Sequence, residues 1–199
     1  MVLAAFAQAR CLLLWRRAHP VLFAPLLLLQ ACAGLQPDMA PEPGRAAEFV
    51  VQGRFSVQYG EEQMSGLLHW QADSARDELV LSSPLGQGLA RIIRNPEGVT
   101  LARPGEADVV ADNVEKLTES TLGFRLPLSG LRYWIQGKAD PAGVLTGEET
   151  RLREDGMYDR LQQNGWTIDY LQYRDAHPRK IHVRRDTLQI RLVIDEWQP

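Results

Sequence analysis

The chain has 199 residues with 22 Lys and Arg against 25 Asp and Glu, which gives a formal net charge of −3. The basic residues are scattered along the chain, so the composition argues against a nucleic-acid partner. Its four histidines lack the cysteine or carboxylate spacing of a metal site. The sequence has neither a nucleotide-binding glycine loop nor a nucleophile elbow. We therefore expect a protein that is not an enzyme, with no cofactor, no metal and no catalytic residues.

The first segment, residues 1–31, has the order of a secretory signal peptide. Three arginines and no acidic residue precede an apolar run over residues 21–29. The sequence Leu29-Gln30-Ala31-Cys32 then matches a bacterial lipobox, in which the cysteine thiol receives diacylglycerol and the new amino terminus is acylated. The run is shorter than the roughly 20 apolar residues of a membrane span, which disfavours an uncleaved anchor. A secreted protein that is cut near Ala31 and keeps Cys32 unmodified stays open as an alternative.

Residues 32–47 are predicted to be the lipidated cysteine and a flexible tether. Three prolines and mostly small or polar residues follow Cys32, a composition typical of linkers. Residues 48–199 are long enough for one domain with a substantial core. Cys11 leaves with the signal peptide, so a lipidated Cys32 leaves the mature protein without a disulfide. The fold of this domain must then depend on its core alone.

Short stretches of alternating apolar and polar residues dominate the chain from Phe49 onward. Alternation with a period of two is typical of half-buried antiparallel strands. Turn residues separate these stretches, and Asn164-Gly165 is the strongest hairpin signal because both residues tolerate the positive φ of a type I′ turn. We expect strands over residues 49–59, 64–71, 79–82, 89–94, 99–102, 109–110, 149–153, 159–163, 166–173, 180–184 and 187–197.

Two helices are predicted between the sixth and seventh of these strands. Asp112 and Glu115 have the spacing of a capping box, which starts the first helix, and Gly123 ends it. The second helix is expected to begin at Ser129 and to stop at Gly137. Its apolar residues Leu131, Trp134 and Ile135 have the spacing of one buried helical face.

These elements together predict a mainly β (α+β) fold. Ten or eleven short antiparallel strands favour an open barrel or half-barrel, and the helices would form a lid or plug over its apolar concave face. The periodicity leaves open whether the interior is packed solid or hollow, and a packed core is the ordinary outcome.

An ordered set of segments covers nearly the whole predicted domain and, with the lipobox, resembles the outer-membrane lipoprotein LolB family. The segments are Gly53–Val57, Gly66–Trp70, Ser83–Gly86, Leu126–Leu128, Leu131–Ile135, Gln163–Trp166 and a closing strand that ends at Trp197.

The resemblance implies a hydrophobic cavity that accepts the acyl chains of lipoprotein cargo from the periplasmic carrier LolA. It also implies ATP-independent insertion of the cargo into the inner leaflet of the outer membrane, by a monomer that is lipid-anchored there and faces the periplasm. Ordinary core packing is an equal alternative for each residue that could line the cavity. These candidates are Leu68, Trp70, Leu131, Trp134, Ile135 and Trp166.

The turn Pro84-Leu85-Gly86 is the predicted membrane-insertion loop. In LolB proteins the leucine of this turn protrudes and helps to put cargo into the membrane, and Leu85 matches it. A turn leucine that folds back onto the body is the simpler alternative. At the level of the whole protein, an envelope lipoprotein that binds a lipid or a protein partner without transferring it also stays open.

Overall fold

Eleven strands form one antiparallel sheet in the computed structural model, which describes residues 48–146 and 149–198. The predicted signal peptide, Cys32 and the predicted tether lie outside these residues. Buried apolar residues between Phe49 and Ile194 form one hydrophobic cluster, so the domain has a core of its own. Within the described part of the chain, none of the helices has the length and apolar character needed to cross a bilayer.

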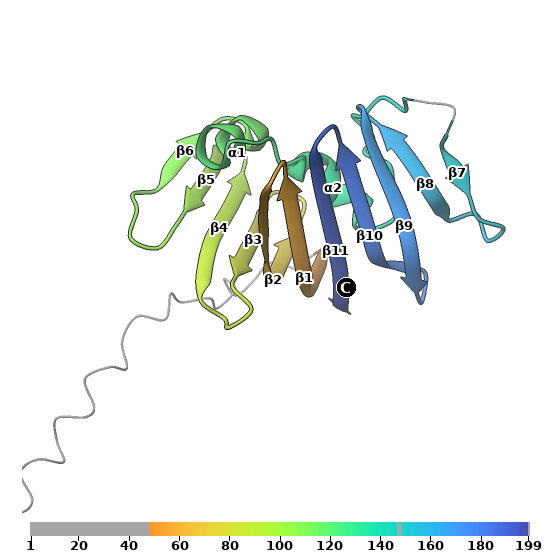
Figure 1. The fold of residues 1–199 in the computed structure, drawn as a ribbon, viewed down its shortest axis with the longest axis horizontal. Helices are drawn as coiled ribbons and strands as arrows, with labels where there is room; N and C mark the ends of the chain where they lie inside the picture. The colour runs from red at the N-terminus through yellow and green to blue at the C-terminus, as the bar shows by residue number, and fades with distance from the viewer. Residues whose placement is uncertain (1–47, 147–148, 199) are drawn as a thin grey trace, which may run out of the picture. The chain divides into compact units, whose positions relative to one another are not determined.

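The order of the strands brings the two ends of the domain together at the centre of the sheet. The first meander comprises β1 (Phe49–Tyr59), β2 (Glu62–Ala72), β3 (Asp77–Ser82), β4 (Gly88–Asn95), β5 (Gly98–Ala102) and β6 (Val109–Ala111). The second comprises β7 (Arg151–Leu152), β8 (Tyr158–Gln163), β9 (Trp166–Arg174), β10 (His177–Arg185) and β11 (Leu188–Gln198). The first meander runs outward from β1 and the second runs inward to β11, which pairs with β1 (Figure 1).

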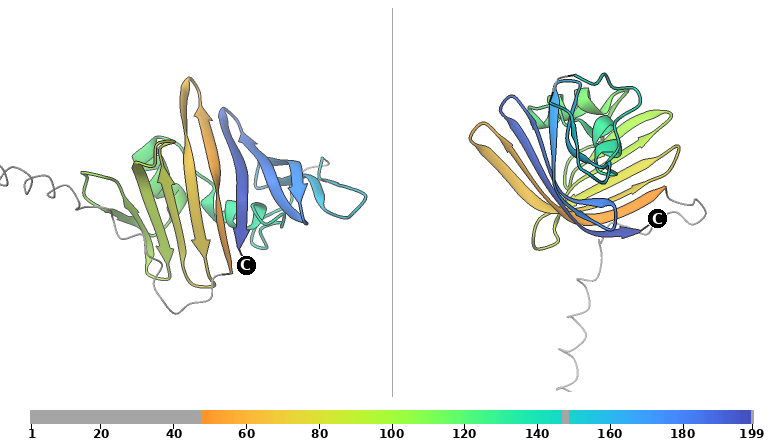
Figure 2. Two further views of the ribbon diagram at one scale, coloured as in Figure 1. Left: turned by 90° about the horizontal axis from the view of Figure 1, so that it is seen from below. Right: turned by 90° about the vertical axis from the view of Figure 1, so that its right-hand side faces the viewer.

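The predicted open half-barrel is confirmed, because β6 and β7 lie at opposite edges and do not pair. The chain must cross from one edge to the other between these strands. It does so with α1 (Val114–Leu122) and α2 (Leu128–Trp134), which lie on the open, concave side (Figure 2). The topology therefore places the helices where a lid or plug was expected.

Two glycines allow β1 and β2 to lie close to their neighbours where the sheet curves. A Cβ on Gly53 would lie 2.2 Å from the backbone oxygen of Val193 in β11, next to a bulge in the pairing of the two strands. A Cβ on Gly66 would lie 2.0 Å from the backbone oxygen of Ser82 in β3. Both sites require glycine because no side chain fits there.

The first helix starts one residue later than the capping-box spacing predicts. Asn113, not Asp112, is the N-cap, and its side-chain oxygen accepts a hydrogen bond from Lys116 N. Glu115 does not reach back to the cap; its carboxylate accepts a hydrogen bond from Ser129 N instead, at 3.2 Å. Gly123 ends the helix in the left-handed conformation, as predicted.

The second helix and the seventh strand also differ from their predicted bounds. The helix begins at Leu128 and its last helical residue is Trp134, with Ile135 as C-cap; Gly137, with φ of 74°, closes the turn that follows. The strand predicted over residues 149–153 shrinks to the two residues of β7. As an edge strand it pairs on one side only, with β8, so alternation overestimated its length.

Candidate functional site

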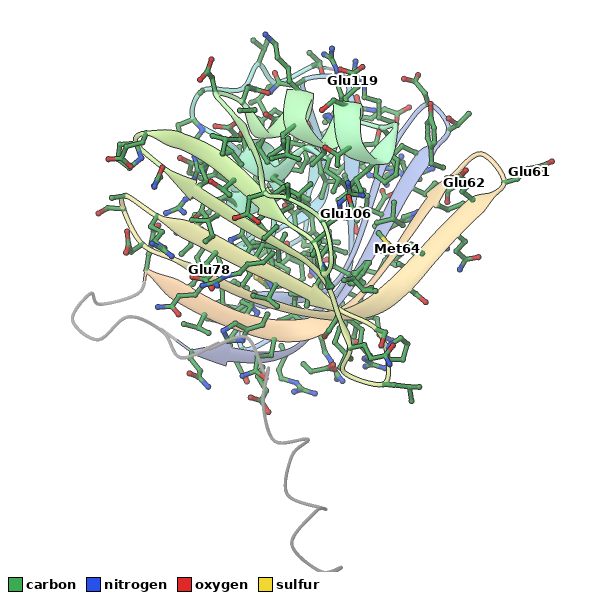
Figure 3. All side chains as sticks on the ribbon, turned by 90° about the vertical axis from the view of Figure 1, so that its left-hand side faces the viewer. Glu61, Glu62, Met64, Glu78, Glu106 and Glu119 are labelled. Atoms are coloured by element: carbon green, nitrogen blue, oxygen red, sulfur yellow. The ribbon has the colours of Figure 1, made fainter. Side chains whose placement is uncertain are left out.

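A small apolar cavity lies between the concave face of the sheet and α2. Its volume is about 40 Å³, against the roughly 300–1,000 Å³ of ordinary ligand sites. Met64, at its edge, belongs to the β1–β2 hairpin whose tip carries the exposed Glu61 and Glu62 (Figure 3). Every side chain that lines the cavity is apolar or aromatic: Phe55, Val57, Met64, Leu68, Trp70, Leu79, Leu81, Leu126, Leu128, Leu131, Ile135, Ile190 and Leu192.

The six side chains predicted to line a cavity are all buried, but they divide into two groups. Leu68 and Trp70 of β2 border the cavity from the sheet, and Leu131 and Ile135 border it from α2 and its C-cap. Trp134 and Trp166 pack against each other beside it, with ring centroids 6.3 Å apart. Sequence alone leaves this division open because it depends on which way α2 is turned.

Buried hydrogen bonds tie one flank of α2 to β8 and β9. The indole N–H of Trp134 donates to Gln163 Oε1 at 2.9 Å, and the backbone N–H of Asp140 donates to the same oxygen at 2.9 Å. The hydroxyl of Tyr170 donates to the backbone oxygen of Trp134 at 3.0 Å, and burial raises the pKa of Tyr170, so this donor stays protonated. Gln163 is 1% exposed. In the sequence, only the alternation of β8 places it on the inner face, and nothing else indicates that it is a buried hydrogen-bond acceptor.

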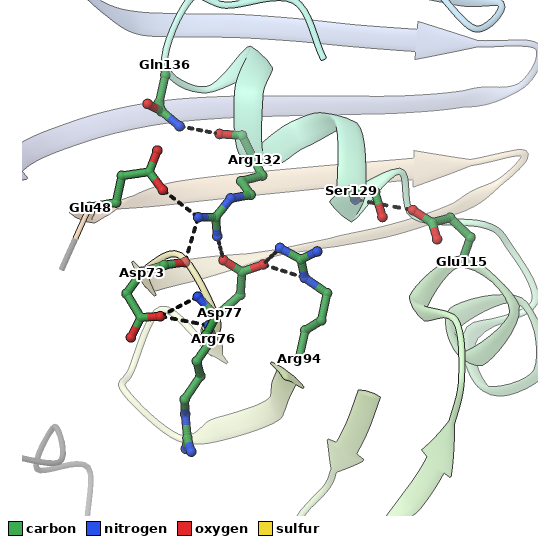
Figure 4. Close-up of polar contacts among 10 residues, drawn as sticks. Glu48, Asp73, Arg76, Asp77, Arg94, Glu115, Ser129, Arg132 and Gln136 are labelled. Atoms are coloured by element: carbon green, nitrogen blue, oxygen red, sulfur yellow. Dashed lines mark hydrogen bonds and ion pairs between the residues drawn. The ribbon is translucent and has the colours of Figure 1, made fainter. Parts of the chain in front are cut away.

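A buried ion pair ties the other flank of α2 to the sheet (Figure 4). The guanidinium of Arg132, on α2, pairs with the carboxylate of Asp77 in β3. Arg132 Nη2 also donates to Glu48 Oε2 at 2.6 Å and to the backbone oxygen of Asp73 at 2.7 Å. Arg94 from β4 pairs with the other oxygen of Asp77. Sequence analysis missed this cluster, because Asp77 and Arg132 are 55 positions apart.

The turn between β3 and β4 presents Leu85 to solvent. Its side chain is 90% exposed, the largest fraction among the described residues that are large and hydrophobic. Gly86 N donates to the backbone oxygen of Ser83 at 2.8 Å, and Gln87 N donates to Ser83 Oγ at 3.2 Å. Gly86 has φ of 83°, a left-handed conformation that favours glycine. The turn is therefore hydrogen-bonded, and Leu85 does not fold back onto the body.

A larger cleft, of about 720 Å³, lies near the β9–β10 turn and the end of β11. Charged side chains such as Lys138, Arg174 and Glu196 contribute to its walls. A hydrocarbon chain gains free energy from apolar surface, so this cleft suits an acyl chain less well than the small apolar cavity does. In the part of the chain that the structure describes, no three His, Cys, Asp or Glu side chains are grouped so that they could hold a metal ion.

The fold and the interior define a half-barrel that holds a helix against an apolar concave face. Residues 47–197 match the family model described as outer membrane lipoprotein LolB. A protein named outer-membrane lipoprotein LolB from Thiobacillus denitrificans is 47% identical over 173 residues, which cover 85% of this chain and 91% of the relative. Another of that name, from Cupriavidus metallidurans, is 38% identical over 198 residues, covering 90% and 96%.

The chain therefore belongs to the outer-membrane lipoprotein LolB family, and it is an outer-membrane lipoprotein of the lipoprotein-localization system. A solved structure of a LolA superfamily protein from Nitrosomonas europaea aligns with a TM-score of 0.43 and 7% identity, covering 75% of this chain and 85% of that one. This likeness is too distant for a comparison of residues.

Proposed function

We propose that this protein receives lipoproteins from the periplasmic carrier LolA by taking their acyl chains into its apolar interior. It then places them in the inner leaflet of the outer membrane without ATP. Lipidation of Cys32 anchors it there as a monomer that faces the periplasm. The supporting observation is the interior itself: thirteen side chains surround one cavity, and all of them are apolar or aromatic.

Acyl binding in such an interior needs only apolar area and a movable cover. Each methylene that leaves water contributes about 0.8 kcal/mol, and an acyl chain has many methylenes. A cavity of about 40 Å³ is too small for such a chain, so binding requires Leu131 and Ile135 of the α2 region to move away from the sheet. An acyl chain then replaces their contacts with the sheet, and cargo moves from carrier to receptor to membrane by differences in affinity alone.

The decisive experiment uses a soluble form that begins after Cys32 and therefore lacks the lipid anchor. It is incubated with a purified carrier–lipoprotein complex, and the cargo is followed by separating the two proteins. A transfer receptor removes the cargo from the carrier. If the cargo stays on the carrier although the soluble form is folded, the protein is a passive binding module and the proposal is wrong.

Leu85 is proposed to act in delivery to the membrane. An exposed leucine that enters the bilayer surface contributes about 2 kcal/mol of apolar burial, and a glutamate there removes this contribution. Leu85→Glu should leave uptake from the carrier largely intact and should lower the rate of delivery to liposomes about thirtyfold.

The matched control for Leu85→Glu is Leu171→Glu on β9. Leu171 is 65% exposed but lies outside the turn, so this change should affect neither step. If Leu85→Glu also delivers cargo at the wild-type rate, the turn has no role in insertion.

A further inference from the structure

Trp70 carries a buried hydrogen-bond donor that nothing in the described structure uses. The residue is 4% exposed, and none of the described residues accepts a hydrogen bond from its indole N–H. Trp134, the buried tryptophan on α2, has Gln163 as its acceptor. Buried N–H groups are satisfied in most proteins because an orphaned donor is unfavourable. The unpaired N–H of Trp70 is therefore an exception to the usual pairing of buried donors.

The surroundings of the ring offer a water molecule few partners. Trp70 borders the apolar cavity of about 40 Å³, whose walls contribute no other polar side chain. It also borders a space of about 10 Å³ that Asp77 and Arg94 help to line. These two groups pair with each other, and Asp77 also pairs with Arg132. A buried water needs two to four polar partners and at least about 10 to 15 Å³. The larger cavity offers no partner besides Trp70, and the smaller space is at the lower limit of that volume.

Packing alone does not require an indole at this position. The ring makes an edge-to-face contact with Phe49, with centroids 5.7 Å apart, and otherwise faces apolar side chains. A phenylalanine could make contacts of this kind without burying a donor. What tryptophan adds is the N–H, on a ring that borders from β2 the cavity that Leu131 and Ile135 border from α2. The nitrogen itself is fully buried while α2 lies against the sheet, so a ligand can reach it only when the α2 region moves away.

We infer that Trp70 recognises the polar head of an acyl chain by donating a hydrogen bond from Nε1 to a carbonyl oxygen. The acceptor is the ester or amide carbonyl that begins each acyl chain of a lipoprotein, a group absent from plain hydrocarbon. This inference rests on the proposed function, since the carbonyl arrives only with an acyl chain that displaces the α2 region. Trp70 then makes the interior selective for acyl groups over other apolar molecules.

The test compares two synthetic lipopeptides with the same peptide and chain length. One carries dipalmitoylglyceryl-cysteine with ester carbonyls, and the other carries the dihexadecylglyceryl ether, which has none. The soluble form should bind the ester about fivefold more tightly, the ratio expected of one neutral hydrogen bond. Trp70→Phe should bind both probes equally, with the affinity that the wild type has for the ether.

Measurements of stability distinguish carbonyl recognition by Trp70 from a purely structural role of its ring. Trp70→Phe loses buried ring volume but no satisfied hydrogen bond, so it should lower the urea midpoint of the ligand-free protein only modestly. The matched control is Trp134→Phe, which loses a satisfied hydrogen bond to Gln163. It should lower the midpoint more than Trp70→Phe does, because both variants lose the same ring volume, and it should keep the fivefold preference for the ester.

The other possible outcomes contradict either the role of Trp70 or the proposed function. If wild type binds both probes equally, or if Trp70→Phe keeps the preference, Trp70 does not read the carbonyl, although the proposed function stands. If Trp70→Phe weakens both probes by the same factor, the ring acts through packing and the inference is wrong. If wild type binds neither probe, the proposed function itself fails.

Discussion

The two sides of α2 are held in opposite ways. Toward β8 and β9, Trp134 is fixed by hydrogen bonds with Gln163 and Tyr170. Toward β2, Leu131 meets the sheet across an apolar cavity and offers only dispersion and hydrophobic contact. A hydrocarbon chain can replace the second kind of contact but not the first. The difference indicates that the β2 side of the interior can open without breaking the hydrogen bonds of Trp134.

Arg132 adds a third contact, at the rim next to the cavity. Its ion pair with Asp77 links α2 to β3, and both side chains are less than a tenth exposed. Opening of the cavity must therefore either keep this pair as a hinge or break it. Polar contacts of α2 should contribute most to the stability of the fold, and apolar contacts should determine acyl binding. The variants below test this difference, from the largest expected effect to the smallest.

Arg132→Met should be the most destabilising change. It leaves the carboxylate of Asp77 with Arg94 as its remaining ion-pair partner and also removes the contacts with Glu48 and Asp73, so it should cost about 3 kcal/mol. Urea unfolding measures the change. The control Arg125→Met removes an exposed pair with Glu119 and should cost less than about 1 kcal/mol. Equal effects of the two variants would mean that the buried pair does not hold α2.

Gln163→Leu breaks the contacts on the opposite flank. It removes the acceptor of Trp134 Nε1 and both hydrogen bonds with the backbone of Asp140, which should cost about 2 to 3 kcal/mol. Gln162→Leu is the control, because Gln162 lies on the other face of β8, and it should stay within about 0.5 kcal/mol of wild type. A Gln163→Leu protein as stable as the control would contradict the anchoring role of this flank.

Leu68→Phe adds volume to the apolar side. Because the cavity leaves some room beside Leu68, the free energy of unfolding should fall by only about 1 kcal/mol, while acyl-probe binding should weaken markedly. Isothermal titration with the ester lipopeptide measures the second effect. Leu67→Phe, on the opposite face of β2, should change neither quantity. Unaltered binding in Leu68→Phe would place the acyl site elsewhere.

His182→Gln should have the smallest effect, and it concerns the convex face behind the Trp134 flank. Burial, together with Arg191 and Arg184, lowers the pKa of His182 below 6.5. A histidine with a lowered pKa stabilises the fold above its unfolded pKa, and this contribution is lost as pH falls through the folded pKa. The urea midpoint of wild type should therefore fall between pH 7.5 and pH 5, and His182→Gln should lessen that fall. An identical pH profile for both proteins would exclude His182 as a source.

The sequence by itself determined the features that depend on residues close together along the chain. Alternation predicted the strands of the half-barrel because each has one dry and one wet face. Asn164-Gly165 and Gly123 marked a hairpin and a helix end because each demands a positive φ, which the structure has at all three residues. Family-specific segments pointed to the LolB family before any contact was known.

Only the tertiary structure decided what depends on distant parts of the chain. The first helix starts after Asn113, and Glu115 turns away from its cap to bind Ser129 N. The ion pair of Arg132 with Asp77 exists because the chain must cross the concave face between β6 and β7. That crossing also fixes the rotation of α2, which puts Leu131 at the cavity and Trp134 among its hydrogen bonds. Local pattern shows that a side chain is buried, but the packing of distant segments decides what it is buried against.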